Sequence, residues 1–200
     1  MRNTKNFKNN ELDSNFSYHR WIWYVYGYLS LARIGVEKLE KENRTPATIT
    51  SLENYFSYRK KYLLIPIIYN IKHAIEIIYK ALKVQVDVKY IRSHNIIDLS
   101  KAVKESIEKL GLTIKSTELD ELAIIAEKYF KLKIFNKKVI NATSIFDSQN
   151  DIFRFPNDIL NSEKLNEVSK KEINEFLIDI KKLNQLLCAI KESIQKTKIF

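Results

Sequence analysis

Apolar residues recur at spacings of three and four along most of the chain, which is the pattern of one face of an α-helix. The first such segment runs from Phe16 to about Glu42, and its aromatic and aliphatic residues spread over several faces. A helix that is apolar on several sides either lies in the centre of a core or meets a partner chain. The last segment runs from Ser169 to about Thr197 and opens with Ser-x-x-Glu, a capping box that marks a helix start.

Two further helical segments follow the first. Thr48 or Thr50 is expected to cap a short helix that ends near Tyr58. Residues 62–83 then carry an apolar stripe, and Pro66 among them fits either the first turn of a new helix or a kink. The pattern therefore predicts a helix boundary or a bend at this proline.

The remaining chain contains two more helical patterns and three segments of other kinds. Residues 84–91 alternate apolar and polar side chains, which favours an extended crossing. A helix follows that ends at Leu110 before a glycine, and another is expected over residues 116–135. Residues 136–168 look irregular, and the polar residues 1–15 are expected to form a flexible tail.

Together these segments predict an all-α fold, a single helical bundle of five or six helices over residues 16–200. The chain has only three glycines and three prolines, which suits long helices with few tight turns. Its one cysteine, Cys188, excludes an intrachain disulfide and is expected to be a small buried residue of the last helix.

Neither a metal site nor a cofactor is expected, because the three histidines are scattered and lack the spacing of zinc ligands. No run of about 18 apolar residues is present, so no transmembrane helix and no membrane partner are expected. The N-terminal residues lack the apolar core of a secretory signal, and the cytoplasm is the expected location.

The charge of the chain raises the question of nucleic-acid binding. Lys and Arg number 34 against 24 Asp and Glu, a formal net charge of +10, and a basic surface attracts phosphate backbones. Residues 128–138 interleave lysines with aromatic residues, as a strip for single-stranded RNA would. The other interpretation is a helix end with aromatics in the core and lysines in solvent. The lysines of this strip are Lys128, Lys131, Lys133, Lys137 and Lys138.

The aromatic residues of the first helix are candidates for a partner interface, either with a second copy or with another protein. They are Trp21, Trp23, Tyr24 and Tyr28. The alternative is that this helix is simply the central helix of the core.

Histidines supply the candidate chemistry. In the stretch RSHNIIDL, Ser93 or Asn95 begins a helix, and Asp98 reaches back as in a capping box. The other interpretation is that Arg92 and His94 bind a phosphate together with the amides of the first turn.

A second histidine lies within the stripe-bearing segment of residues 62–83. His73, Glu76 and Lys80 are spaced at i, i+3 and i+7, which places them on one helix face as a hydrogen-bonded trio. Alternatively, His73 and His94 face each other across a groove as an acid–base pair. The sequence alone does not bring these two histidines together.

Three motifs resemble the HEPN superfamily. They are HAIEIIYKALK (73–83), HNIIDLSKAV (94–103) after a connector of about ten residues, and FRFP (153–156). The resemblance implies a compact helical bundle, often a dimer. Many members are metal-independent ribonucleases of toxin–antitoxin, CRISPR and antiviral defence systems, and others serve as binding or assembly modules.

Nuclease members of this superfamily carry an arginine and, after four to six residues, a histidine on one helix. The histidine transfers protons near neutral pH and the arginine holds the scissile phosphate. None of the seven arginines here has a histidine at that spacing, so the usual ribonuclease motif is missing. Arg154 of FRFP either pairs with Asp151 or Asp158, or is the anion-binding residue of a degenerate site.

The resemblance, without its nuclease motif, implies a non-catalytic HEPN-like module of a prokaryotic defence or stress-response system. Its partner is expected to be RNA, a second copy in a homodimer, or another defence protein. One alternative is a divergent metal-independent ribonuclease whose site is assembled in a dimer from His73, Arg92, His94 or Arg154. The other alternative is a structural or regulatory helical subunit with no nucleic-acid role.

Overall fold

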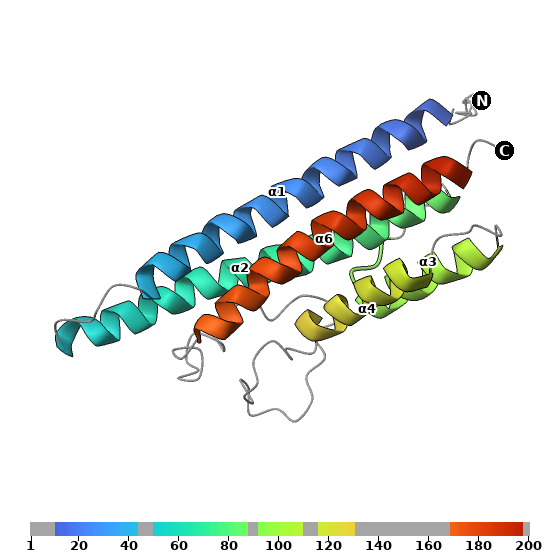
Figure 1. The fold of residues 1–200 in the computed structure, drawn as a ribbon. Helices are drawn as coiled ribbons and strands as arrows, with labels where there is room; N and C mark the ends of the chain where they lie inside the picture. The colour runs from blue at the N-terminus through green and yellow to red at the C-terminus, as the bar shows by residue number, and fades with distance from the viewer. Residues whose placement is uncertain (1–10, 44–49, 88–91, 110–115, 131–168, 198–200) are drawn as a thin grey trace, which may run out of the picture.

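The computed structural model describes residues 11–43, 50–87, 92–109, 116–130 and 169–197, and these residues form an all-α bundle without strands (Figure 1). This confirms the predicted fold class. The five helices of the described chain are α1 (Glu11–Asn43), α2 (Thr50–Asp87), α3 (Ile96–Lys109), α4 (Ser116–Phe130) and α6 (Lys170–Thr197).

Helix α2 is the centre of the arrangement, since it packs against each of the other four helices. The long helices α1, α2 and α6 lie alongside one another, and the shorter α3 and α4 lie on the other side of α2 (Figure 1). The start of α1 and the end of α6 lie at the same end of the bundle. Helix α2 is accordingly buried on most of its surface from Leu64 to Val86.

Helix α1 shows a one-sided pattern instead. Its fully buried residues recur at spacings of three and four and face α2 and α6: Ile22, Val25, Leu29, Ala32, Val36 and Leu39. Gly35 lies at the contact with α2, where an added Cβ would be 2.7 Å from Cγ1 of Ile67. The absence of a side chain at this glycine therefore lets the two helices approach closely.

Two predictions about the segment that forms α2 are wrong: a helix boundary between Tyr58 and Pro66, and an extended chain over residues 84–87. The helix runs without a boundary from Thr50 to Asp87, with Pro66 inside it on the exposed side. A proline removes one backbone hydrogen bond, but the burial of its neighbours on either side keeps the helix continuous here. Residues 84–87 are helical and not extended, because Val84 and Val86 are both buried in the bundle, and tertiary packing overrides their preference for strands.

Two helix starts follow the capping signals of the sequence, but the predicted capping box of Asp98 is wrong. The backbone N–H of Asn95 donates to Oγ of Ser93 at 3.0 Å, and the Asp98 carboxylate accepts from the Ser93 hydroxyl at 3.3 Å. Asn95 accepts a hydrogen bond from the backbone N–H of Ile97 at 2.9 Å and begins α3. Ser169 and Glu172 form the predicted capping box of α6: the backbone N–H of Ser169 donates to the carboxylate at 2.7 Å, and the backbone N–H of Glu172 donates to Oγ at 3.2 Å.

Other boundaries differ from the predictions or cannot be compared with them. Helix α1 begins at Glu11 and so takes in part of the expected tail, since no glycine or proline interrupts the chain before Gly27. The described part of α4 ends at Phe130. The predicted irregular segment, residues 136–168, lies outside the described residues.

Candidate functional site

The side chain of Glu76 gathers both histidines of the middle of the chain. Only 3 % of this side chain is exposed, and it lies in the C-terminal half of α2. Its Oε1 accepts a hydrogen bond from Nζ of Lys80 at 2.7 Å and lies 2.9 Å from Nδ1 of His94. Its Oε2 lies 3.5 Å from Nδ1 of His73. The four residues form one polar group, called here the Glu76 cluster.

The local sequence explains how the cluster forms. Spacings of three and four place His73, Glu76 and Lys80 on one face of α2, as predicted. His94 comes from the connector, and the cap at Asn95 fixes the backbone directly after it. Helix α3 then packs on α2 through buried residues such as Leu99, which holds the imidazole against the carboxylate.

The electrostatics of the cluster are those of a buried ion pair with an exposed edge. The side chain of Lys80 is 3 % exposed, so its ammonium group and the Glu76 carboxylate need each other as counter-ions. His94 is different, because 49 % of its side chain is exposed. An ionised Glu76 favours the tautomer in which Nδ1 of His94 carries the proton and donates, which leaves Nε2 as a proton acceptor. An imidazole oriented by a carboxylate is half of a general acid–base arrangement.

His73 lies deeper and is packed between aromatic rings. It stacks on Tyr69 with centroids 5.3 Å apart, and Tyr28 of α1 meets it edge-on at 4.7 Å. Burial raises the pKa of the Tyr28 phenol, and the nearby Tyr69 and Glu76 raise it further. Tyr28, a predicted interface residue, is thus half-buried and links α1 to the Glu76 cluster.

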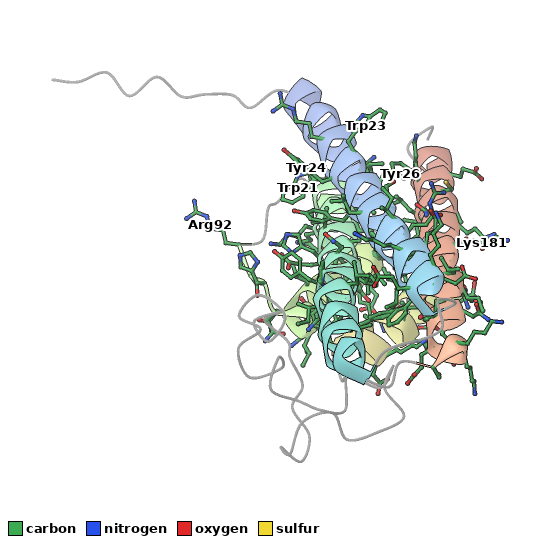
Figure 2. All side chains as sticks on the ribbon, turned by 90° about the vertical axis from the view of Figure 1, so that its left-hand side faces the viewer. Trp21, Trp23, Tyr24, Tyr26, Arg92 and Lys181 are labelled. Atoms are coloured by element: carbon green, nitrogen blue, oxygen red, sulfur yellow. The ribbon has the colours of Figure 1, made fainter. Side chains whose placement is uncertain are left out.

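The other ribonuclease candidates do not join the cluster within the described residues. Arg92 is exposed on the connector, and Figure 2 shows its side chain projecting away from the bundle. Arg154 lies outside the described residues, so its predicted role stays a prediction. The structure therefore brings together His73 and His94 from the set of four.

Helix α1 presents an apolar face to solvent, opposite its buried stripe. Trp23 is 75 % exposed, and Tyr24, Leu31 and Ile34 are each more than half exposed. Trp21 is partly buried against the core, as Tyr28 is, so the predicted interface divides into two exposed and two packed residues (Figure 2). Sequence reasoning missed Ile34, although its spacing from Leu31 already placed it on this face.

Lys128, the first lysine of the predicted RNA strip, lies in a structural ion-pair network. Its Nζ lies 2.6 Å from a carboxylate oxygen of Asp179 and 3.2 Å from one of Glu175. The hydroxyl of Tyr129 also donates to Asp179, at 2.9 Å. The charge of Lys128 is therefore already balanced by α6. Lys131, Lys133, Lys137 and Lys138 lie outside the described residues and stay predictions.

Cys188 is exposed, so the prediction that it is buried is wrong. The buried stripe of α6 passes through Leu183 and Leu187, and Cys188 lies beside it at a groove of about 680 Å³ that also borders Arg33 of α1. Its Sγ lies 3.7 Å from the hydroxyl of Tyr26.

Two findings concern other classes of site. Among the described residues, no group of three His, Cys, Asp or Glu side chains is placed to hold a metal ion. None of the described helices is long and apolar enough to cross a membrane.

Comparisons of the chain with protein-family models, with curated proteins and with solved structures find no match. The resemblance to the HEPN superfamily therefore stays a prediction, and function is argued from the geometry of the described residues.

Proposed function

We propose that this chain is an HEPN-like helical module of a prokaryotic defence or stress-response system that acts by binding a partner protein or RNA. The apolar outer face of α1 is the observation that carries the proposal, with Trp23, Tyr24, Leu31 and Ile34 all mainly exposed. Contiguous exposed apolar residues on a soluble domain mark interaction sites, and aromatic residues supply much of the binding energy at interfaces.

The arrangement of the Glu76 cluster supports binding over catalysis. The carboxylate of Glu76 is engaged by the buried Lys80 at 2.7 Å and by His94 at 2.9 Å. His73 is enclosed by Tyr69 and Tyr28 with 15 % of its side chain exposed, so only His94 of the two histidines is open to solvent, and the cluster does not present an acid and a base together to a substrate. The stacked rings around His73 add packing to this arrangement. The cluster then acts as a set of polar contacts that fixes the connector before α3 against α2.

The experiment that tests this proposal purifies the chain from cells that naturally produce it and measures the mass and composition of the complex. We expect a stoichiometric complex with protein or RNA. A Trp23→Ser/Ile34→Ser variant should lose a bound protein. Ile178→Ser is the matched control, because Ile178 is equally apolar and 62 % exposed but lies on α6. A bare monomer from the parent chain would refute the proposal.

A second candidate function is metal-independent RNA cleavage, and one observation favours it. The 2.9 Å contact between Glu76 and His94 orients an imidazole whose other side is open to solvent. Such a group can accept a proton from a ribose hydroxyl. In this case, RNA cleavage in the presence of a chelator should disappear in His94→Ala and persist in Lys101→Ala, a variant of an exposed residue on α3.

A further inference from the structure

The exposed residues of α1 follow the spacing of a coiled-coil seam. Tyr24, Gly27, Leu31 and Ile34 are separated by three, four and three positions, and all four lie on the solvent side of the helix. Gly27 contributes only backbone there, because it has no side chain. We call these four residues, with Trp23 beside them, the α1 seam. It extends over ten residue steps, or about 15 Å of helix.

Gly27 is the unusual member of the α1 seam. A glycine inside a helix costs about 0.5–1 kcal/mol relative to alanine. At Gly35 the structure explains this cost, because a Cβ there would be only 2.7 Å from Ile67. At Gly27 no atom lies within 4 Å of the position of an added Cβ, so nothing in the described chain requires the missing side chain. A close approach by a second molecule would require it, since bare backbone between large residues forms a hole for a partner's side chain.

The charged residues around the α1 seam indicate which sign of charge the partner molecule should carry. Between residues 20 and 42, the exposed charged residues of α1 are Arg20, Arg33, Glu37, Lys38 and Lys41. Four of these five are basic, and the acidic Glu37 forms an i,i+4 ion pair with Arg33 at 3.5 Å. Glu40 and Glu42 on the same stretch are only partly exposed. The chain as a whole carries a formal net charge of +10. A partner with acidic residues at its edges is therefore attracted to this face.

We infer that the α1 seam docks an amphipathic helix whose apolar positions follow the heptad pattern and whose flanking positions are acidic. This inference rests on the proposed function and names the chemistry of the partner. A second copy of the chain fits less well. An antiparallel copy that pairs Tyr24 with Ile34 places Arg20 opposite Lys38 at both ends, and a parallel copy places each cation opposite itself.

The test is a selection from a displayed library of helical peptides. Peptides of about 28 residues are long enough to form helices, with apolar residues at the a and d positions and random Glu or Lys at e and g. The parent chain is the bait. We expect the selected peptides to carry Glu at most e and g positions and to bind more weakly as the salt concentration rises.

Variants of the chain show where the selected peptides bind. Gly27→Ala fills the hole without touching any described atom, so the chain stays folded and binding should weaken by about tenfold or more. Leu31→Ser should remove binding, and Ile178→Ser should leave it unchanged. Circular dichroism of each variant confirms that the helices are intact.

The outcomes separate this inference from the proposed function. Selection of lysine-rich peptides, no preference between the two charges, no selected peptide, or binding unaffected by Gly27→Ala and Leu31→Ser would each overturn the inference. A parent dimer that dissociates in Leu31→Ser would also overturn it, while the proposed function would stand with a second copy as the partner. The purification from native cells judges the proposed function independently of any peptide.

Discussion

Replacing Glu76 by alanine tests the physical account of the cluster most sharply. The substitution leaves the ammonium group of Lys80 buried, with 3 % of its side chain exposed and its counter-ion removed. Removing one partner of a buried ion pair costs about 3–5 kcal/mol. The lost contact with His94 adds little, because 49 % of that side chain is exposed and water replaces the bond. We therefore expect Glu76→Ala to lower the free energy of unfolding by about 4 kcal/mol.

The assay is urea denaturation followed by far-UV circular dichroism, with the same m-value required for all variants. The double variant Glu76→Leu/Lys80→Met replaces both charges with apolar side chains of similar size and should unfold within about 1 kcal/mol of the parent. Glu105→Ala is the control, because its pair with Lys101 spans 3.8 Å on the surface and contributes less than about 1 kcal/mol. A loss below about 1 kcal/mol in Glu76→Ala, or a double variant as unstable as the single one, would refute the reasoning.

Other substitutions and conditions test separate parts of the structure. Gly35→Ala should destabilise the fold by about 1–3 kcal/mol by crowding Ile67, whereas Gly27→Ala should stabilise it by about 0.5–1 kcal/mol, and equal effects in urea denaturation would contradict the packing described. Asp179→Ala removes the acceptor of two side-chain donors and should cost about 2–4 kcal/mol in the same assay; a change below about 0.5 kcal/mol would show that α6 is not held there. Burial raises the pKa of Tyr79 from 10.0 to about 12, so its phenol stays protonated in the fold when it ionises in the unfolded chain. The free energy of unfolding that this phenol contributes is complete below pH 10.0 and falls by about 3 kcal/mol as pH rises toward about 12. An alkaline titration of tyrosine absorbance at 295 nm that is the same for the parent and for Tyr79→Phe would contradict this.

Local signals in the sequence predicted local structure well. The cap at Asn95 and the capping box at Ser169 are confirmed, because each depends on side chains within three residues of the helix start. The helix through Pro66 and residues 84–87 was not predictable in the same way. Its continuity depends on burial against the other helices, which local patterns do not encode.

The candidate site shows the same difference between local contacts, which the sequence predicted, and long-range contacts, which it did not. Helical spacing was enough to place His73, Glu76 and Lys80 on one face. The approach of His94 to Glu76 spans 18 positions of sequence and depends on how α3 packs against α2. The helical period of α1 could have identified Ile34, because this period places Ile34 on the same exposed face as Trp23 and Tyr24.

The most direct test of the account is to measure whether the chain cuts RNA. The purified chain is incubated with a labelled mixed RNA pool in the presence of a chelator, beside a His94→Ala variant that remains folded. The account predicts that the RNA stays intact in both reactions, whether or not the chain binds it. Cleavage by the parent chain that disappears in His94→Ala would contradict the account and make the Glu76 cluster a ribonuclease site.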